Sequence, residues 1–273
     1  MAVSMADISH LRKMTGAGMM DCKNALTEAN GDFDQAMEII RKKGQAVAAK
    51  RSDRDASEGC VLAKNEGKKA TMLALKCETD FVAKNEDFIK LTEDILNLAT
   101  SNNAADLDAV NKLQLGDVTV ADAVVERSGI TGEKMELDGY SVVEGESVAT
   151  YIHAGNKLGA IVAFNQVVEE EVGHEVAMQI AAMNPIAINP ESVPADVLEQ
   201  EKQIAADKAR QEGKPENLIE RIAEGRINKF YKEVCLLEQE YVKDPKLTIG
   251  KFLDKQSKGL TVVAFKRFNL NED

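Results

Sequence analysis

The tetrapeptide Thr79-Asp80-Phe81-Val82 combines residue types that could act on another molecule without covalent chemistry. It follows an apolar run at residues 71–77, which predicts a buried strand, and it precedes Asn85, which can cap the next helix. A large apolar ring therefore stands beside a carboxylate on a short strand-to-helix connection. Such connections usually lie at the surface, and a rigid ring held there suits insertion into a partner's pocket. The alternative is that Phe81 folds back onto its own core, since phenylalanine is commonly buried.

The cysteine and histidine residues do not form a pattern typical of a metal site or a catalytic nucleophile. The sequence contains no C-x-x-C pair, zinc-ligand spacing, nucleophile elbow, P-loop, dinucleotide fingerprint or HExxH motif. We therefore expect no catalytic residue, no metal site and no cofactor, and we expect a binding protein rather than an enzyme. Scattered, unpaired cysteines also favour a reducing compartment. These residues are Cys22, Cys60, Cys77, Cys235, His10, His153 and His174.

Composition and charge restrict the kinds of partner. A net charge of −12 and an aromatic content of 4% without tryptophan argue against direct binding of nucleic acid. Residues 1–10 contain no apolar signal region, and no stretch approaches the length of a membrane span, so we expect a cytoplasmic protein without membrane contact. Basic residues cluster between Arg41 and Arg54. They suit either a helix C-terminus followed by a solvated linker or a contact with a partner.

Residues 1–45 predict a compact module of three helices. Apolar residues recur three and four positions apart in each helix, residues 15–18 break the first helix, and Asn30-Gly31 ends the second. Asp32 can cap the third helix, and Gly44 follows it. The layout resembles ubiquitin-associated (UBA-like) modules, which are mostly interaction domains. Residues 46–57 are small and charged without periodicity, which predicts a linker or a linker helix.

The remaining residues predict an α+β core of two subdomains with antiparallel sheets. The first subdomain spans residues 58–139 and carries the tetrapeptide, and Thr119 is a candidate cap for one of its helices. The second subdomain spans residues 140–188 and 228–273. Residues 189–227 predict an inserted antiparallel helical hairpin, or coiled coil, whose thin apolar stripe indicates projection from the core. This stripe suits pairing of two hairpins in a homodimer and a solvated arm equally well.

Two motifs resemble the signatures of the bacterial elongation factor Ts family. They are LRKMTGAGMMDCK at residues 11–23 and ETDFVAK at residues 78–84. Shorter similar stretches are HAG at 153–155 with KLG at 157–159, and EGR at 224–226 with KF at 229–230. The resemblance runs in unbroken order from about residue 8 to residue 268. Some family members continue into a further C-terminal helical module, whose contacts we do not expect here.

The resemblance implies a guanine-nucleotide exchange factor for elongation factor Tu. By motif match, Phe81 would wedge beside the nucleotide site and displace Mg²⁺, with Asp80 as its polar neighbour and Thr79 and Val82 shaping the loop. The residues implied in further contacts are Arg12, Met19 and Met20 for docking on the GTPase domain, and His153 and Leu158 for the second subdomain. The other hypothesis is a non-catalytic adaptor that binds partners through its three-helix module.

Overall fold

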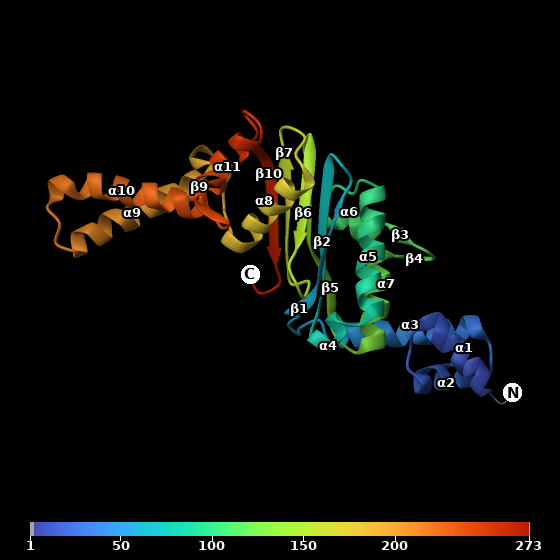
Figure 1. The fold of residues 1–273 in the computed structure, drawn as a ribbon. Coiled ribbons are helices and arrows are strands. Elements are labelled where there is room, and N and C mark those ends of the chain that lie inside the picture. Colours follow the sequence, from blue (N-terminus) through green and yellow to red (C-terminus); the bar gives the residue numbers. More distant parts are fainter. Residues whose placement is uncertain (1–2, 273) are drawn as a thin grey trace.

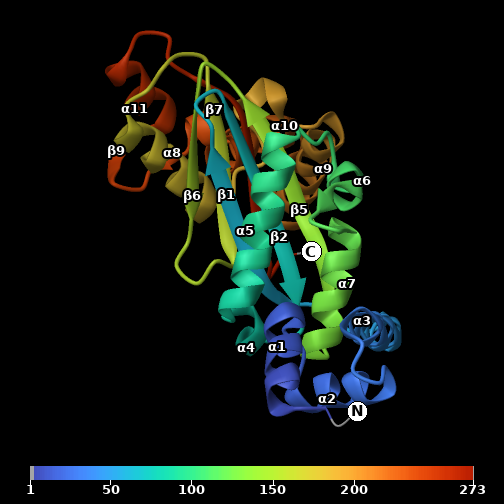
Figure 2. The same cartoon turned by 90° about the vertical axis from the view of Figure 1, so that its right-hand side faces the viewer.

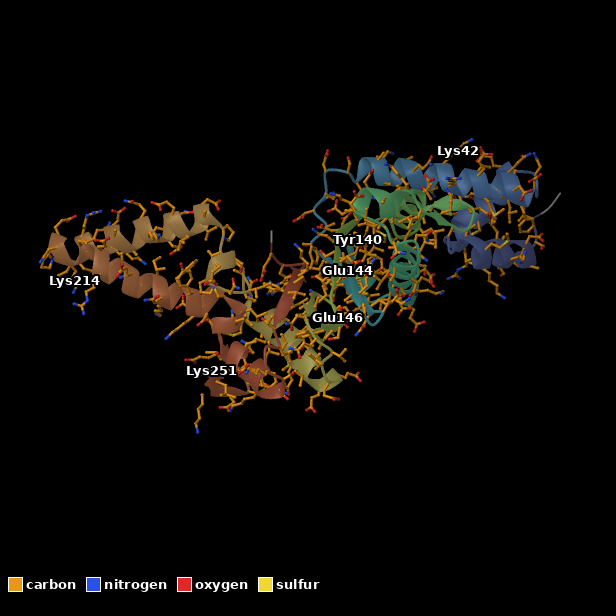
Figure 3. All side chains as sticks on the ribbon, turned by 90° about the horizontal axis from the view of Figure 1, so that it is seen from above. Lys42, Tyr140, Glu144, Glu146, Lys214 and Lys251 are labelled. Atoms are coloured by element: carbon orange, nitrogen blue, oxygen red, sulfur yellow. The ribbon has the colours of Figure 1, made fainter. Side chains whose placement is uncertain are left out.

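The computed structural model of the protein describes residues 3–272. They form an elongated molecule with three helices at one end, a helical hairpin at the other and two three-stranded antiparallel sheets between them (Figure 1). Seen from above, Lys42 in the helical end and Lys214 in the hairpin lie far apart, on opposite sides of the sheets (Figure 3). The α+β class with antiparallel sheets that the sequence predicts is confirmed.

We call the first three helices the head: α1 (Met5–Thr15), α2 (Met19–Glu28) and α3 (Phe33–Lys50). Asp32 caps α3 by accepting a hydrogen bond from the amide of Gln35, as the sequence predicts. The apolar positions of the three helices face one another, so these short helices stabilise each other by packing. The buried residues are Ile8, Leu11, Ala17, Cys22, Ala25, Leu26, Ala29 and Ala36. The likeness of the head to UBA-like modules stays a prediction.

Helix α3 continues beyond the end that the sequence predicts. We expect it to stop at Gly44, with residues 46–57 as a linker or a linker helix, but α3 itself runs on to Lys50, and only residues 51–57 lie outside helices and strands. Gly44 is buried against Gly129 of α7 (Val120–Thr131). Because neither residue has a Cβ, the two helices approach closely, and this packing offsets the roughly 1 kcal/mol that glycine costs inside a helix.

The first sheet has the strand order β1 (Glu58–Asn65), β2 (Lys69–Cys77), β5 (Met135–Glu144). Helices α5 (Glu86–Ser101), α6 (Leu107–Lys112) and α7 cover one of its faces (Figure 2). The short ribbon of β3 (Gln114–Leu115) and β4 (Val118–Thr119) lies beside these helices (Figure 1). Asn85 caps α5 and Thr119 caps α7, as the sequence predicts. The expected boundary between residues 139 and 140 falls inside β5, where Gly139 has φ of +60° beside a shift in the pairing register.

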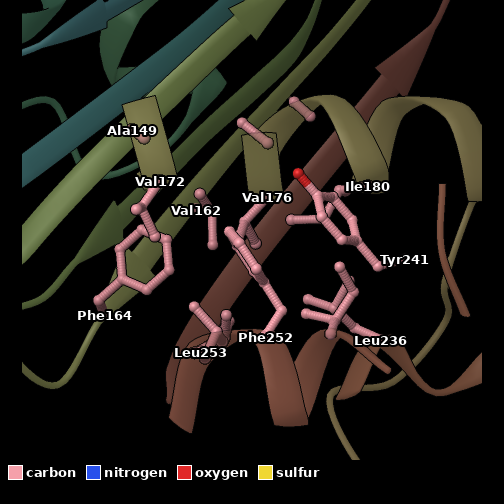
Figure 4. Packing of buried hydrophobic residues seen from close by; sticks show 14 of the residues in the cluster. Ala149, Val162, Phe164, Val172, Val176, Ile180, Leu236, Tyr241, Phe252 and Leu253 are labelled. Atoms are coloured by element: carbon pink, nitrogen blue, oxygen red, sulfur yellow. The ribbon is translucent and has the colours of Figure 1, made fainter. Parts of the chain in front are cut away.

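The second sheet has the order β10 (Val262–Asn269), β7 (Leu158–Phe164), β6 (Ser147–Ile152). Its outer face packs on α8 (Glu170–Met183) and α11 (Ile249–Gln256) through residues that include Val162, Val176 and Phe252 (Figure 4). The short ribbon of β8 (Glu240–Tyr241) and β9 (Asp244–Thr248) adds Tyr241 to this core. Its inner face packs on the first sheet, so the two sheets share one core. The buried residues of this shared core are Val61, Ala70, Met72, Ala74, Val143, Val148, Ile161, Ala163 and Leu270.

The hairpin consists of α9 (Ala195–Gln211) and α10 (Glu216–Val234), flanked by the short 3-10 helices η1 (Pro190–Ser192) and η2 (Leu236–Glu238). In α9 and α10 only Ala205, Ala209, Ile219 and Ile227 are buried, so the two helices project from the sheets (Figure 1). The expected boundary at residue 227 falls inside α10, because the rest of this helix packs on the base of the hairpin. In residues 3–272, each helix is too short or too polar to cross a bilayer.

Candidate functional site

Phe81 lies on α4 (Asp80–Ala83), a single helical turn directly after β2 and the connecting residues 78 and 79. Its side chain is 85% exposed, the highest value among the large hydrophobic residues of the described chain. The alternative that Phe81 folds back onto its own core is therefore wrong. Burying a phenylalanine ring stabilises a fold by roughly 1.5–3 kcal/mol. Because the ring of Phe81 is exposed, it does not contribute this free energy to the protein's own core.

The neighbours of Phe81 hold α4 against the body. Val82 is half-buried and packs against the core between the first sheet and its helices. The Thr79 hydroxyl caps the turn by accepting the amide hydrogen of Val82 at 3.4 Å. Asp80 forms an ion pair with Lys84 at 2.6 Å, one turn further on. The hydrogen bond from Lys84, together with its charge, lowers the pKa of the Asp80 carboxyl.

A carboxylate that sequence reasoning did not identify, Glu133, binds the start of α4. It accepts hydrogen bonds from the amides of Glu78 and Thr79, at 3.1 and 3.0 Å, and from the Thr79 hydroxyl at 2.6 Å. Glu133 precedes β5 and reaches residue 79 because β2 and β5 pair at Cys77 and Met135. This pairing is between residues far apart in the sequence, so no local pattern could reveal the contact.

Glu78 makes the reverse contact and reaches toward the head. Its carboxylate accepts the amide hydrogen of Lys134 at 2.6 Å and pairs with the Arg51 guanidinium at 2.9 Å. The Lys134 hydrogen bond, and after it the Arg51 hydrogen bond and charge, lower the pKa of Glu78. Arg51 immediately follows α3, so this ion pair joins the end of the head helix to the segment that carries Phe81.

The turn between β6 and β7 lies at the same end of the sheets as α4 (Figures 1 and 2). Lys157 in this turn pairs with Glu58 of β1 at 2.6 Å. His153 is exposed, and its Nδ1 shares a hydrogen bond with the Tyr151 hydroxyl at 2.8 Å. Leu158 is only half-buried and packs against the core of the second sheet. His153 is thus accessible to a partner, whereas much of Leu158 serves its own fold.

The docking candidates of the head lie around the turn between α1 and α2. Arg12 is exposed in the last turn of α1, and Met20 is 63% exposed in the first turn of α2. Met19 is half-buried and packs against the head core. Arg12 and Met20 therefore offer a cation and a flexible apolar side chain on the surface, while Met19 supports the turn.

The cysteine, histidine and acidic side chains of the described residues are the candidates for thiol reactivity and for metal binding. All four cysteines are buried, and burial raises the pKa of Cys77 to about 12 and that of Cys235 to about 11. Such thiols are poor nucleophiles because the reactive thiolate is scarce near neutral pH. Within residues 3–272, no cluster of three or more histidine, cysteine or acidic side chains is placed to hold a metal ion.

An exposed ring on a tightly held turn, beside a helical head, suits a protein that acts by binding another protein. The elongation factor Ts family model matches residues 78–272, and the chain is 58% identical to "Elongation factor Ts" of Porphyromonas gingivalis (strain ATCC 33277) over 274 residues, covering all of both chains. The chain belongs to the elongation factor Ts family, as its motifs predict. Members of this family are nucleotide exchange factors of translation elongation, not enzymes in the usual sense.

Two further relatives also match along their whole length. "Elongation factor Ts" of Azobacteroides pseudotrichonymphae is 52% identical over 272 residues, which cover 99% of each chain. "Elongation factor Ts" of Bacteroides thetaiotaomicron is 51% identical over 330 aligned positions, which cover all of both chains. The similarity therefore includes the head and the hairpin as well as the two sheets.

Proposed function

We propose that this chain releases GDP from elongation factor Tu by inserting Phe81 beside the partner's nucleotide site. The ring enters between switch-region helices of the GTPase and shifts them, which disturbs the partner's Mg²⁺ and phosphate loop. The observation that carries this proposal is the 85% exposure of Phe81 on a turn held by Thr79 and Val82. Asp80 is the polar neighbour of the ring.

The energetics require more than one contact. Burying one phenylalanine ring in a partner contributes roughly 1.5–3 kcal/mol, which corresponds to about a tenfold to hundredfold gain in affinity. A factor that binds the empty GTPase more tightly than the loaded one weakens nucleotide binding by the same factor, because coupling is reciprocal. Since Mg²⁺ is a large local charge at a phosphate site, shifting its ligands removes a large part of the nucleotide's binding free energy.

We call residues 78–84, which carry Phe81, the exchange loop. The additional contacts come from both sides of it. We assign docking on the GTPase domain to the head, through Arg12 and Met20 with Met19 supporting them. We assign a second contact to the turn between β6 and β7, where His153 is exposed and Leu158 anchors the turn. These contacts hold the partner while Phe81 acts, and so they account for the separate parts of the molecule.

The test is release of fluorescently labelled GDP from purified elongation factor Tu, followed by stopped flow. We expect acceleration by the unchanged protein and a loss of roughly tenfold or more for Phe81→Ala, given the free energy of burying the ring. Val167→Ala is the matched control, since Val167 is 78% exposed and lies between β7 and α8, away from α4 in the sequence. A failure of the unchanged protein to accelerate release would exclude the proposal.

A further inference from the structure

The direction of Phe81 depends on a helical turn too short to be stable alone. Helix α4 has four residues, and an isolated helix of this length does not form in water. Its stability must come from Val82 and Ala83, which pack on the core, and from the cap at Thr79. Whatever fixes Thr79 therefore fixes the direction in which Phe81 leaves the surface.

Glu133 determines how the Thr79 hydroxyl acts as a cap. A hydroxyl group has one proton to donate and two lone pairs that accept. Because Thr79 donates its proton to Glu133 at 2.6 Å, its lone pairs are free to accept the Val82 amide hydrogen. The second carboxylate oxygen of Glu133 meanwhile accepts the backbone amides of residues 78 and 79. One carboxylate thus sets both the backbone and the hydroxyl at the start of α4.

Glu133 is itself held by the end of α7. Gly132 ends that helix in the left-handed region, with φ of +75°, and its amide binds the Ser128 carbonyl at 2.9 Å. The Ser128 hydroxyl donates to the carbonyl of Glu133, and the Glu133 amide donates to the Thr131 hydroxyl at 3.3 Å. The Glu133 backbone therefore has a fixed position directly after the end of α7, the helix that packs against the head.

We propose that Glu133 is a positioning residue for Phe81, which transmits the position of α7 and the attached head to the exchange loop. This role requires no contact between Glu133 and the partner. It acts through Thr79 by keeping α4 folded and Phe81 directed outward before the partner binds. The proposal rests on the proposed function of Phe81, and it assigns to the known family activity a residue outside the two sequence motifs.

Exchange kinetics of Glu133→Gln test this role. The amide side chain keeps the size but cannot accept all three hydrogen bonds, because its nitrogen is a donor. We expect a fall of about tenfold in the maximal GDP-release rate, in line with the loss of hydrogen bonds to a charged group. The factor concentration that gives half of this rate should change less than about threefold, since the head is untouched. Glu136→Gln, three residues away on β5 and paired with Lys134 at 3.2 Å, is the matched control.

A double-mutant cycle with Phe81→Ala separates positioning from a general loss of structure. If Glu133 acts through Phe81, Glu133→Gln should slow exchange in the unchanged background and have no further effect in the Phe81→Ala background. Equal slowing in both backgrounds, or none in either, overturns the positioning role while leaving the proposed function intact. If Phe81→Ala itself exchanges normally, the proposed function fails, and that result is visible without Glu133.

Two further measurements cover the case in which Glu133→Gln folds poorly. Hydrogen exchange should speed up at the amides of residues 78–84 while the thermal transition stays cooperative. Thr79→Val removes the hydroxyl but leaves Glu133 its two backbone partners, so it should slow GDP release by a similar fold. Normal release by Thr79→Val, or unchanged amide protection at residues 78–84 in Glu133→Gln, would overturn the proposal.

Discussion

Gly44 and Gly129 bring the backbones of α3 and α7 into direct contact. A Cβ added to Gly129 would lie 2.0 Å from the Cα of Gly44, whereas one added to Gly44 would lie 3.4 Å from the Cα of Gly129. The first distance is impossible without separating the helices, and the second is an ordinary contact. Because of this asymmetry, two closely matched substitutions, one at each glycine, can test the contact between α3 and α7.

We predict that Gly129→Ala destabilises the protein and Gly44→Ala does not. Overpacking at Gly129 should lower the free energy of unfolding by about 1–3 kcal/mol, because α3 and α7 must move apart. At Gly44 the methyl group fits, and alanine's higher helix propensity adds up to about 1 kcal/mol of stability. Denaturant unfolding monitored by circular dichroism measures both changes. Equal stability of the two variants would show that the helices are not in backbone contact.

A second prediction separates stability from exchange within the loop. Phe81→Ala should leave the melting temperature unchanged because the ring is exposed, whereas Val82→Ala should lower the free energy of unfolding by about 1 kcal/mol through lost burial. Both variants should slow GDP release, since Val82 anchors the turn that carries the ring. Calorimetry beside exchange kinetics checks this. A stability loss in Phe81→Ala larger than in Val82→Ala would place the ring in the core.

Local sequence patterns predict the elements of this fold well because caps and periodicity are local. Asp32, Asn85 and Thr119 are recognisable as caps, and each accepts the expected amide hydrogen bond. Gly44 fails as a stop signal because glycine suits two different situations, a left-handed helix end and a close helix contact. Only the position of α7 shows which of these two situations applies to Gly44, and the sequence around Gly44 does not reveal that position.

The tetrapeptide that carries the ring can be recognised from the local sequence, but the residue that holds its turn in place cannot. The tetrapeptide at residues 79–82 is visible as an unusual connection, although the sequence alone leaves open whether Phe81 is buried. The contact of Glu133 with Thr79 depends on the register in which β2 pairs with β5. Register arises from packing over the whole sheet, so a partner residue more than fifty positions away cannot be identified from the loop itself.

A third prediction concerns the thiols. Burial raises the pKa of Cys77 to about 12, and its thiol donates to the Thr79 carbonyl at 3.3 Å. We expect iodoacetamide at about pH 8 to leave Cys77 largely unmodified in the folded protein and to modify all four cysteines in denaturant, because thiolate is the reactive form. Mass spectrometry of digested peptides reads out each site. Rapid alkylation of Cys77 under native conditions would mean that the end of β2 opens readily.

The ion pair between Arg51 and Glu78 predicts a pH-dependent joint between α3 and the exchange loop. The pKa of Glu78 is lowered in the folded protein, so its contribution to stability is present above the unfolded value of 4.5 and is lost as the pH falls through the folded value. Arg51→Gln removes one cause of that shift. Its melting temperature should therefore lie below that of the unchanged protein at about pH 7, and the gap should close toward about pH 3.

Lys50→Gln is the matched control for Arg51→Gln, because Lys50 is exposed at the last position of α3 and loses the same charge. A change in net charge alone would shift both variants equally. If the ion pair is specific, the melting temperature at neutral pH should fall further in Arg51→Gln than in Lys50→Gln. This difference between the two variants should vanish as Glu78 is protonated. Melting curves of the three proteins across the pH range provide the comparison. A gap for Arg51→Gln that persists at low pH would show that Arg51 stabilises the fold by packing and not through Glu78.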